Sequence, residues 1–540
     1  MIIRLAAAQH ATGCDVAENL DTTLRMIDLA ASERPDVLVL PEFGNHLSVY
    51  DSFDHARSVA IDLDGPWVER VGSAARRHGF WIQTNCTVRR AADRITNTNL
   101  LFDPQGTLRA ANDKTVLMGA EGIHLSPAER AADLVDAEIE GEILRIGTYA
   151  CMDGVVPEVP RTLAVRGARL LLNSLNSFAL DEASIHIPVR AAENRAWLVA
   201  CCKIGPLLPP DRLAEFSTAM GVPEPMLRGA GESQIVRPDG AVVAKAGRDE
   251  EEVVVADADL SLVGLPRPDG TDLRNGRRPR VYRALAEPTP AQDLHSRADE
   301  VRVAAGSIAE LPHLIESGAR LVVLPELSLD DHAIAAITHQ LRGRDCLVVS
   351  TRRHEGPHGA SHCGIAIDAT GVVAHAPQIH RVGRHRWVEH LGEAVVTIDR
   401  DWGRVAIVVG DDVLYPEVPR LAALASADVI AVPWAAGGEP WDVDLCLPER
   451  AAENRVNLVA AGPVAMIVDL PPDFTLWAPE RTRPFDGTIN LPDIVDDPSS
   501  AIGLVHPSRA LNRRISRNTD LVDGRPWRLC ESLVDSDPTR

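Results

Sequence analysis

Three side chains with catalytic potential each follow a stretch of sequence that is typical of a β-strand. Glu42 comes directly after the apolar run VLVLP, Lys114 closes a predicted hairpin, and Cys151 follows RIGTYA. Reactive groups in α/β proteins are often placed where strands end, because the strand fixes the backbone while the following loop opens a pocket. A carboxylate, an ammonium group and a thiol in one pocket would support nucleophilic catalysis.

Each residue type suits a different step of that chemistry. A thiolate of Cys151 would be the nucleophile, although an ordinary thiol is only slightly ionised at neutral pH. Glu42 would be the base that takes the thiol proton and later activates water. Lys114 would favour the thiolate and stabilise the oxyanion of a tetrahedral intermediate, with the backbone N–H of Met152 as a second donor. Taken singly, each residue has a simpler explanation as a loop, surface or core residue.

The sequence around these positions resembles the nitrilase superfamily of carbon–nitrogen hydrolases. The shared motifs are PEF around Glu42, DK at Lys114, CxDxxxPE at 151–158 and RAAENR at 190–195. The resemblance covers essentially all of residues 1–283. It implies an αββα sandwich and a catalytic triad of Glu42, Lys114 and Cys151, since the superfamily uses Glu, Lys and Cys in this order.

Two further residues match positions of the superfamily. Glu121 corresponds to a second glutamate beside the triad, which would orient the lysine or the leaving amine. Asp153 corresponds to an aspartate expected to brace the turn after the nucleophile. The chain departs from the family at Val155, where members often carry arginine.

The residues after the cysteine favour an amide as the substrate. Nitrilases typically have Trp-Glu at this point, whereas CMDGVVPE is closer to the pattern of aliphatic amidases and formamidases. We therefore expect a small amide to be cleaved through a thioester, with release of ammonia or an amine. An N-carbamoyl amidohydrolase, a nitrilase, an acyl-transferring amidase and an ammonia supplier are alternatives. A non-catalytic binding or scaffold protein is the alternative of another class.

Four residues are candidates for the substrate pocket because they lie beside the triad elements. They are Asn45, His46, Asn173 and Phe178. None of them indicates a preference for a carboxylate, an aromatic group or a sugar, so the sequence leaves the substrate itself open.

The elements that must position these residues are predicted as buried strands alternating with amphipathic helices. Strands are expected at 37–40, 80–88, 145–150, 169–174 and 197–205, hairpins at 97–114 and 233–246, and helices at 17–33, 158–167 and 184–196. The uninterrupted run VLVL is typical of a strand that is buried on both faces. This pattern predicts a layered α/β fold with mixed sheets.

Four ordered matches indicate that the fold occurs twice in the chain. PEVPR recurs at 157–161 and 416–420, RAAENR at 190–195 and 450–455, LPE at 40–42 and 324–326, and a TDL motif at 271–273 and 519–521. A period this long excludes a solenoid of short repeats. We predict two tandem αββα sandwiches: a catalytic domain at 1–283, a linker at 284–300 and a second domain at 301–540.

The second copy is predicted to be catalytically inactive. Alignment on PEVPR puts Gly410 at the nucleophile position and Ile379 or His380 at the lysine position, while the glutamate persists as Glu326. Without a thiol the covalent step is lost. Superfamily members commonly pair sandwiches face to face, so we expect the second domain to be a tethered structural partner of the first, since tethering gives a high effective concentration. Further homo-oligomerisation is left open.

Composition limits the partners, the cofactors and the compartment. The net charge of −22 argues against nucleic-acid and anionic-membrane partners. No apolar run approaches the roughly 20 residues of a membrane span, and residues 1–9 are expected to be a first strand, not a signal peptide. Nine cysteines without a CxxC pair favour a reducing compartment, so we expect a cytoplasmic protein. No cofactor or metal is predicted, because His380, Asp411 and Asp412 lack the spacing of a metal site.

Overall fold

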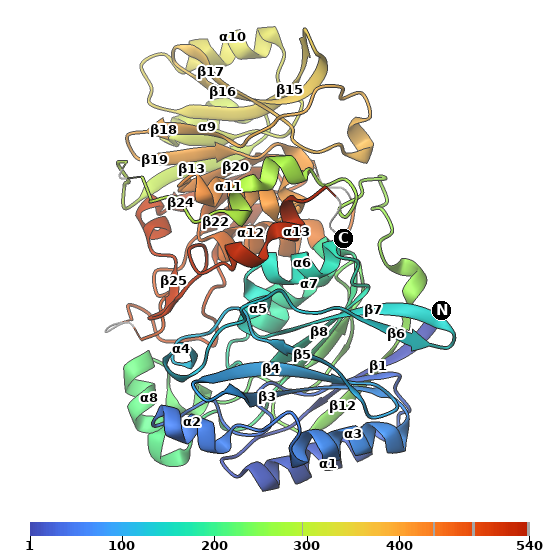
Figure 1. Ribbon diagram of the computed structural model, residues 1–540. Helices are drawn as coiled ribbons and strands as arrows, with labels where there is room; N and C mark the ends of the chain where they lie inside the picture. The colour runs from blue at the N-terminus through green and yellow to red at the C-terminus, as the bar shows by residue number, and fades with distance from the viewer. Residues whose placement is uncertain (294, 436–437, 478–480, 537–540) are drawn as a thin grey trace.

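The chain forms two αββα sandwiches that follow one another in the sequence and stack along the length of the molecule (Figure 1). The computed structural model describes residues 1–293, 295–435, 438–477 and 481–536. In each sandwich two six-stranded sheets face each other, and helices cover their outer faces. The predicted fold class is confirmed.

The sheets of the first sandwich have the strand orders β12-β1-β2-β3-β4-β5 and β11-β10-β9-β8-β7-β6. The first sheet contains β1 (Ile2–Gln9), β2 (Val37–Val39), β3 (Trp81–Ala91), β4 (Arg94–Phe102), β5 (Leu108–Asp113) and β12 (Glu252–Asp259). The second contains β6 (Val135–Ile139), β7 (Glu142–Ala150), β8 (Leu170–Leu175), β9 (Trp197–Cys202), β10 (Gln234–Val236) and β11 (Val242–Lys245). The outer helices are α1 (Val16–Ala31), α3 (Pro66–His78), α6 (Glu158–Val165) and α7 (Ile187–Asn194). The central strands are parallel and the edge strands antiparallel, which makes both sheets mixed.

Alternate side chains of β1 enter different layers of the first sandwich. Leu5 and Ala7 pack between the two sheets. Ala6 and Ala8 point the other way and pack with Ile27 of helix α1. Because successive side chains of a strand point to opposite faces, a strand buried on both faces has to be apolar throughout.

The second sandwich repeats the strand orders of the first, as β24-β13-β14-β15-β16-β17 and β23-β22-β21-β20-β19-β18. One sheet contains β13 (Val301–Gly306), β14 (Leu321–Val323), β15 (Leu347–Gly356), β16 (Gly359–Asp368), β17 (Gly371–Pro377) and β24 (Ser500–Val505). The other contains β18 (Val396–Arg400), β19 (Gly403–Ile407), β20 (Val429–Pro433), β21 (Asn457–Ala461), β22 (Ala465–Asp469) and β23 (Asp493–Asp497). Its helices are α9 (Leu311–Glu316), α10 (Asp331–Gln340), α11 (Glu417–Leu424) and α12 (Leu447–Asn454).

The predicted helix at 184–196 is divided in the structure. A single wide π-type turn at Glu182–His186 precedes α7, and Asp442–Cys446 precedes α12 in the same way. Each α-helix has a proline in its first turn, Pro188 in α7 and Pro448 in α12. Proline has no N–H to donate to a preceding turn, so the hydrogen-bond pattern changes at this point.

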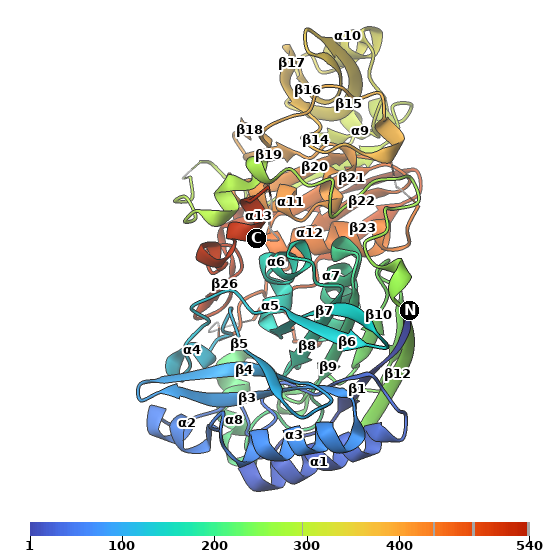
Figure 2. The ribbon, with the colours of Figure 1, turned by 45° about the vertical axis from the view of Figure 1, so that its right-hand side comes forward.

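The repeated PEVPR motifs lie at the contact between the sandwiches. Figures 1 and 2 show α6 and α7 facing α11 and α12. Arg161 of the first motif pairs with Glu417 of the second at 2.9 Å, and Arg420 pairs with Glu158 at 2.9 Å. All four side chains are buried.

The RAAENR motifs repeat this exchange. Arg190 pairs with Glu449 and Glu453, and Arg450 pairs with Glu193 at 2.8 Å. Each motif therefore binds its own copy across the contact, which is the geometry of an isologous two-fold interface built within one chain.

The segment predicted as a linker, 284–300, packs on the second sandwich. Its first residues complete a 3₁₀ helix at Pro279–Ala286, and its described remainder forms no strand. Arg297 donates to Asp428 at 2.6 Å. Leu294 lies outside the described residues, and the domain limits stay a prediction.

Helix length and polarity bear on membrane insertion. The longest helix in the described ranges, α1, has 16 residues. No helix among the described residues has the length and apolar character needed to cross a membrane.

Candidate active site

Glu42, Lys114 and Glu121 form one buried ionic cluster in the first sandwich. Glu42 follows β2, Lys114 follows β5, and Glu121 begins the short helix α4 (Glu121–His124). The Lys114 ammonium donates to Glu42 Oε1 at 2.8 Å and to Glu121 Oε1 at 2.9 Å. Burial lowers the pKa of Lys114, but the two carboxylates outweigh it and hold the pKa well above its usual range. The lysine therefore stays charged.

Asparagines on β3 and β4 orient Glu42, and sequence reasoning missed them. Asn97 donates to Glu42 Oε1 at 2.7 Å, and Asn85 holds Asn97 through a 2.6 Å hydrogen bond. Glu42 Oε2 is buried and accepts no hydrogen bond from the described residues. One carboxylate oxygen is thus fixed while the other is available to accept a proton. The only sequence signal was NTN in a strand, where Asn97 and Asn99 share a face.

Cys151 occupies a strained turn between β7 and α5 (Met152–Val155). Its φ is 48° and its ψ is −109°, a conformation that costs a non-glycine residue about 1–3 kcal/mol. Its backbone N–H donates to the side chain of Asn173 at 2.9 Å and to the carbonyl of Ser174 at 3.0 Å. The strain is therefore held by contacts with β8, and the turn puts the thiol at the edge of the sheet.

The surroundings of Cys151 favour the protonated thiol in the resting site. Burial and the negative charge of Glu42 raise its pKa well above the usual value, and Lys114 opposes this only in part. Nucleophilic attack consequently requires a base that removes the proton as the substrate reacts.

Asp153 ties the end of β7 to the loop after Lys114. Its carboxylate accepts from the backbone N–H groups of Thr115 at 3.0 Å, Val116 at 2.7 Å and Ala150 at 3.2 Å. Lys114 and the nucleophile turn are thereby held in a fixed relation.

A cavity of about 130 Å³ opens at Cys151. Glu121, Cys151 and Met152 are among its lining residues, whereas Glu42 and Lys114 are fully buried and do not line it. Its apolar wall consists of Val49, Met118, Ala120, Val155, Phe178, Ala179, Leu207, Leu208, Phe216, Met220, Leu227, Leu476, Trp477, Ile489 and Ile515. Four of these belong to the second sandwich, and no sequence signal had pointed to them.

Of the four predicted pocket residues, only Phe178 lines the cavity. Asn45 bridges the Val59 carbonyl and the Thr87 N–H instead, and the His46 ring bonds to the Leu47 carbonyl at 2.7 Å. Asn173 is absent from the lining because its side chain turns to the Cys151 backbone. Neighbours in sequence of a catalytic residue need not point the same way.

Comparison with known proteins gives the family. The family model of the carbon–nitrogen hydrolases matches residues 4–267. A hydrolase encoded in the pqqF 5′ region of Pseudomonas protegens is 31% identical over 277 residues, which cover 51% of this chain and 88% of that protein. The chain belongs to the carbon–nitrogen hydrolase family.

Other relatives of this hydrolase carry more specific names. A nitrilase of Pyrococcus abyssi is 26% identical and covers 49% of this chain and 93% of its own. An (R)-stereoselective amidase of a Pseudomonas species is 28% identical, and the match covers 49% of this chain and 87% of that protein. Among solved structures, a variant of an amidase of the nitrilase superfamily from Nesterenkonia AN1 is 22% identical, covers 47% of this chain and 90% of that chain, and has a TM-score of 0.39.

In the second sandwich of the hydrolase, the position of Lys114 is held by Gln378. Lys114 N–H bonds to the Asn97 carbonyl at 2.7 Å, and Gln378 N–H bonds to the His362 carbonyl at 2.8 Å. The predicted position, Ile379 or His380, was wrong by one or two residues. Phe102 pairs with Leu108, whereas Ile367 pairs with Val372, so the second hairpin turn is one residue shorter.

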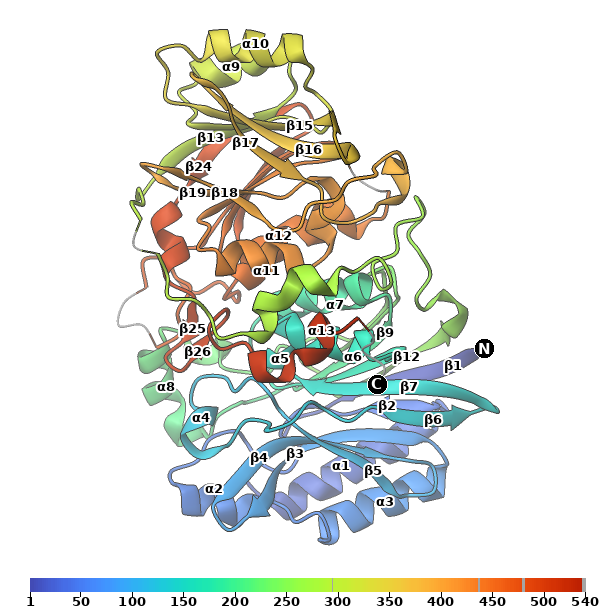
Figure 3. The ribbon, with the colours of Figure 1, turned by 45° about the horizontal axis from the view of Figure 1, so that its top comes forward.

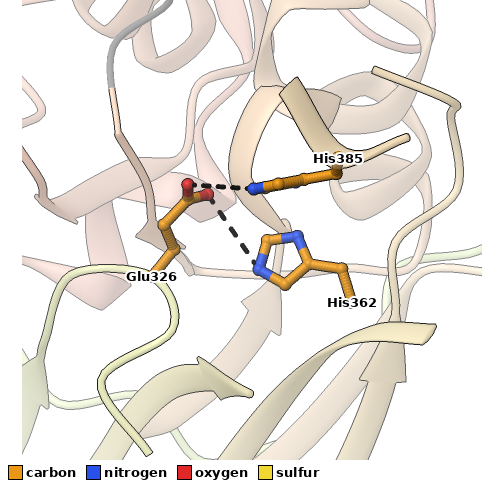
Figure 4. Close-up of side chains that lie close together, drawn as sticks. All are labelled: Glu326, His362 and His385. Carbon is orange, nitrogen blue, oxygen red and sulfur yellow. Dashed lines mark ion pairs between the residues drawn. The ribbon is translucent and has the colours of Figure 1, made fainter. Parts of the chain in front are cut away.

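In place of a lysine cluster, the second sandwich has a cluster of Glu326, His362 and His385, shown in Figure 4. Glu326 lies 3.3 Å from His385 Nε2 and 4.0 Å from His362 Nε2. Their nitrogen and oxygen atoms lie close enough to hold a metal ion. However, Arg384 donates to both oxygens of Glu326 and to Asp411 at 2.6 Å, so a protein cation is already paired with these carboxylates. Gly410 has a φ of 54° where Cys151 has 48°, so the turn is kept without the thiol.

Proposed function

We propose that this hydrolase is a cysteine-dependent amidase whose catalytic residues are Glu42, Lys114 and Cys151. The observation that carries the proposal is the buried Lys114 ammonium, shared by Glu42 and Glu121 beside a cysteine held in a strained turn. Such a cluster costs folding energy, because buried charges lose their hydration. That cost is expected where charges serve chemistry.

The reaction proceeds through a thioester. Cys151 Sγ passes its proton to Glu42 and bonds to the amide carbonyl carbon, whose oxygen becomes negative. Lys114 and the Met152 N–H stabilise this oxygen. The carbon–nitrogen bond then breaks, and Glu42 returns the proton to the leaving nitrogen, which gives ammonia or an amine.

Hydrolysis of the thioester restores the enzyme. Water gives a proton to Glu42 and attacks the acyl carbon. The carbon–sulfur bond breaks, the acid leaves, and Cys151 recovers the proton. Glu121 holds Lys114 throughout, and Asp153 keeps the lysine loop against the nucleophile turn.

An amide is favoured over a nitrile or an N-carbamoyl compound by the residues after the nucleophile. CMDG departs from the Trp-Glu of nitrilases. Relatives named as amidases, including an omega-amidase of Xenopus tropicalis at 25% identity, support this choice. The nitrile and carbamoyl reactions remain the alternatives, since they use the same three residues.

The test is ammonia release from amides, N-carbamoyl compounds and nitriles by the wild type and Cys151→Ala. We expect release from amides that Cys151→Ala abolishes, and an acyl adduct on Cys151 in intact-mass spectra. Cys14→Ala, which changes an exposed cysteine, serves as the matched control and should keep full activity. Ammonia release that survives in Cys151→Ala would refute the proposal.

We further propose that the second sandwich, 301–540, is a degenerate duplicate that pairs with the catalytic domain, 1–283, and is joined to it by the linker 284–300. The repeated strand orders and the reciprocal PEVPR contacts support this. The loss of the thiol and lysine positions supports its inactivity. All nine cysteines are free, which suits the reducing cytoplasm that we propose as its location.

A further inference from the structure

We propose that the second sandwich builds the acyl pocket of the first, with Trp477 as its cap, and that the substrate is an uncharged amide with an apolar acyl group. This inference rests on the proposed amidase function and adds the substrate class. Three features of the cavity support it: the residues of its wall, the contacts that hold this wall in place, and the charged groups that line it.

The cavity at Cys151 has the size of an acyl site, and most of its lining is apolar, with Ser48, Asn176 and Ser177 as its uncharged polar residues. Leu476, Trp477, Ile489 and Ile515 close it from the second sandwich. Its volume of about 130 Å³ is close to the roughly 150 Å³ of an apolar cavity that accepts benzene. An acyl group of about five or six carbons, or a phenyl ring, would fill it.

The loop that carries Glu121 is fastened to the second sandwich. Thr519, in the hairpin of β25 (Arg514–Ser516) and β26 (Thr519–Asp520), accepts from the Gly119 N–H at 2.9 Å and donates to the Leu117 carbonyl at 2.8 Å. Figure 3 shows this hairpin beside α4. A Cβ at Gly119 would lie 2.7 Å from the ring of Trp477, so only glycine lets the indole approach so closely.

The loop on the other side of the cavity is fastened in the same way. Asp181 accepts from the backbone N–H groups of Ile489 at 3.1 Å and Asn490 at 2.6 Å. Phe178 packs against Phe485 with ring centroids 5.7 Å apart. Both rims of the cavity are therefore shaped by contacts with the second sandwich.

The charges around the cavity disfavour an anionic substrate. The described lining has no lysine or arginine, and its carboxyl groups are Glu121, Asp181 and Glu182. His186 is the one histidine of that lining, and it is paired with Glu449 at 2.8 Å. Burial lowers the pKa of His186, but Glu449 outweighs it and raises the pKa to about 9, so the charge of this imidazolium is already paired. A carboxylate on the acyl group would therefore lie buried beside three carboxyl groups without an unpaired cation in the described lining, which is strongly unfavourable.

The test compares acetamide, hexanamide, phenylacetamide and succinamate as substrates of the wild type, Trp477→Ala and Trp477→Phe. We expect kcat/KM to rise about fourfold per methylene, from the roughly 0.8 kcal/mol of burying each one, and succinamate to react poorly. Trp477→Ala should lower kcat/KM for phenylacetamide by about 10–100-fold, as expected for losing a buried aromatic wall, and change acetamide little. Trp477→Phe should restore most of the loss.

Trp527→Ala is the matched control, because this half-buried tryptophan belongs to the second sandwich but does not line the cavity. If Trp477→Ala lowers kcat/KM equally for all amides, or for none, the proposal that Trp477 forms the wall of the acyl pocket is wrong, while the proposal of an amidase is unaffected.

Binding separates the two proposals. Calorimetry of Cys151→Ala should show binding of phenylacetamide and no binding of succinamate. The binding of phenylacetamide should weaken when Trp477→Ala is added to Cys151→Ala. If no amide is hydrolysed but this binding is found, the amidase proposal fails and the apolar pocket stands. Absence of such binding overturns the pocket.

Discussion

At the residue scale, one lysine is paired with two carboxylates, and this charge balance affects whether the Cys151 thiol is protonated. Lys114 supplies a single positive charge to Glu42 and Glu121, so the cluster is negative when both carboxyl groups are ionised. Burial and Glu42 therefore raise the pKa of Cys151 despite the lysine. In the proposed mechanism, proton transfer to Glu42 therefore accompanies the attack on the substrate.

Replacing Glu42 by glutamine should separate thiol reactivity from catalysis. Glu42→Gln removes the anion that raises the pKa of Cys151, so alkylation by iodoacetamide should shift to lower pH. Amide hydrolysis should fall at least about 100-fold, because the base is lost. Glu18→Gln, at an exposed position on α1, should change neither. An alkylation profile that does not move would show that Glu42 does not act on the thiol.

The cluster of Glu42, Lys114 and Glu121 was predictable from the sequence, whereas its support was not. Each of the three follows a recognisable strand or a family motif. Asn97 orients Glu42 from β4, which is separated from β2 by β3, and its register becomes visible only when β4 is paired. Asn45 follows Glu42 by three residues, yet its side chain binds the backbone of another strand. Sequence proximity carries no information about side-chain direction in a loop.

At the element scale, the strands determine where the site lies, whereas the loops determine its shape. The strand ends that carry Glu42, Lys114 and Cys151 were predicted within a few residues, because burial on both faces gives a clear apolar pattern. The loop around Gly119 has no such pattern, since its conformation depends on Thr519, 400 residues away. The error at Gln378 has the same origin, in a hairpin turn of different length.

Gly119→Ala should disturb the loop, and Gly122→Ala should not. At Gly119 φ is 54°, and a Cβ would lie 2.7 Å from Trp477, whereas nothing lies within 4 Å of a Cβ at Gly122. We expect Gly119→Ala to lower the free energy of unfolding by about 1–3 kcal/mol and to reduce kcat/KM for phenylacetamide. Thermal unfolding and the amide assay measure both. Equal behaviour of the two variants would contradict the close packing of Trp477.

At the scale of the whole molecule, buried ion pairs join the sandwiches. Arg161 and Arg277 both donate to Glu417, each at 2.9 Å. Burial raises the pKa of Glu417, but the two guanidinium groups outweigh it and lower the pKa to about 2. A carboxyl group with a lowered pKa stabilises the fold above its usual pKa of 4.5, and this contribution is lost as the pH falls towards 2.

Glu417→Gln should remove this contribution at neutral pH. Lowering the pKa of Glu417 from 4.5 to about 2 corresponds to about 3 kcal/mol, so the variant should be less stable by about that amount at pH 7. The difference from the wild type should shrink below pH 4.5 and vanish near pH 2, as measured by denaturant unfolding across pH. Glu251→Gln breaks an exposed pair with Arg25 and should cost less than about 1 kcal/mol. A constant difference across pH would contradict the assignment.

The wall around Trp477 also affects how this enzyme can change over evolution. In a dimer of identical subunits every substitution occurs in both copies, so a residue that shapes one pocket also alters the other subunit. Here Trp477, Ile489 and Ile515 come from a half that has Gly410 at the position of Cys151. Mutations in that half can select new acyl groups while Glu42, Lys114 and Cys151 stay untouched. If the second sandwich selects the acyl group as proposed, part of the substrate choice is inherited separately from bond cleavage within one gene.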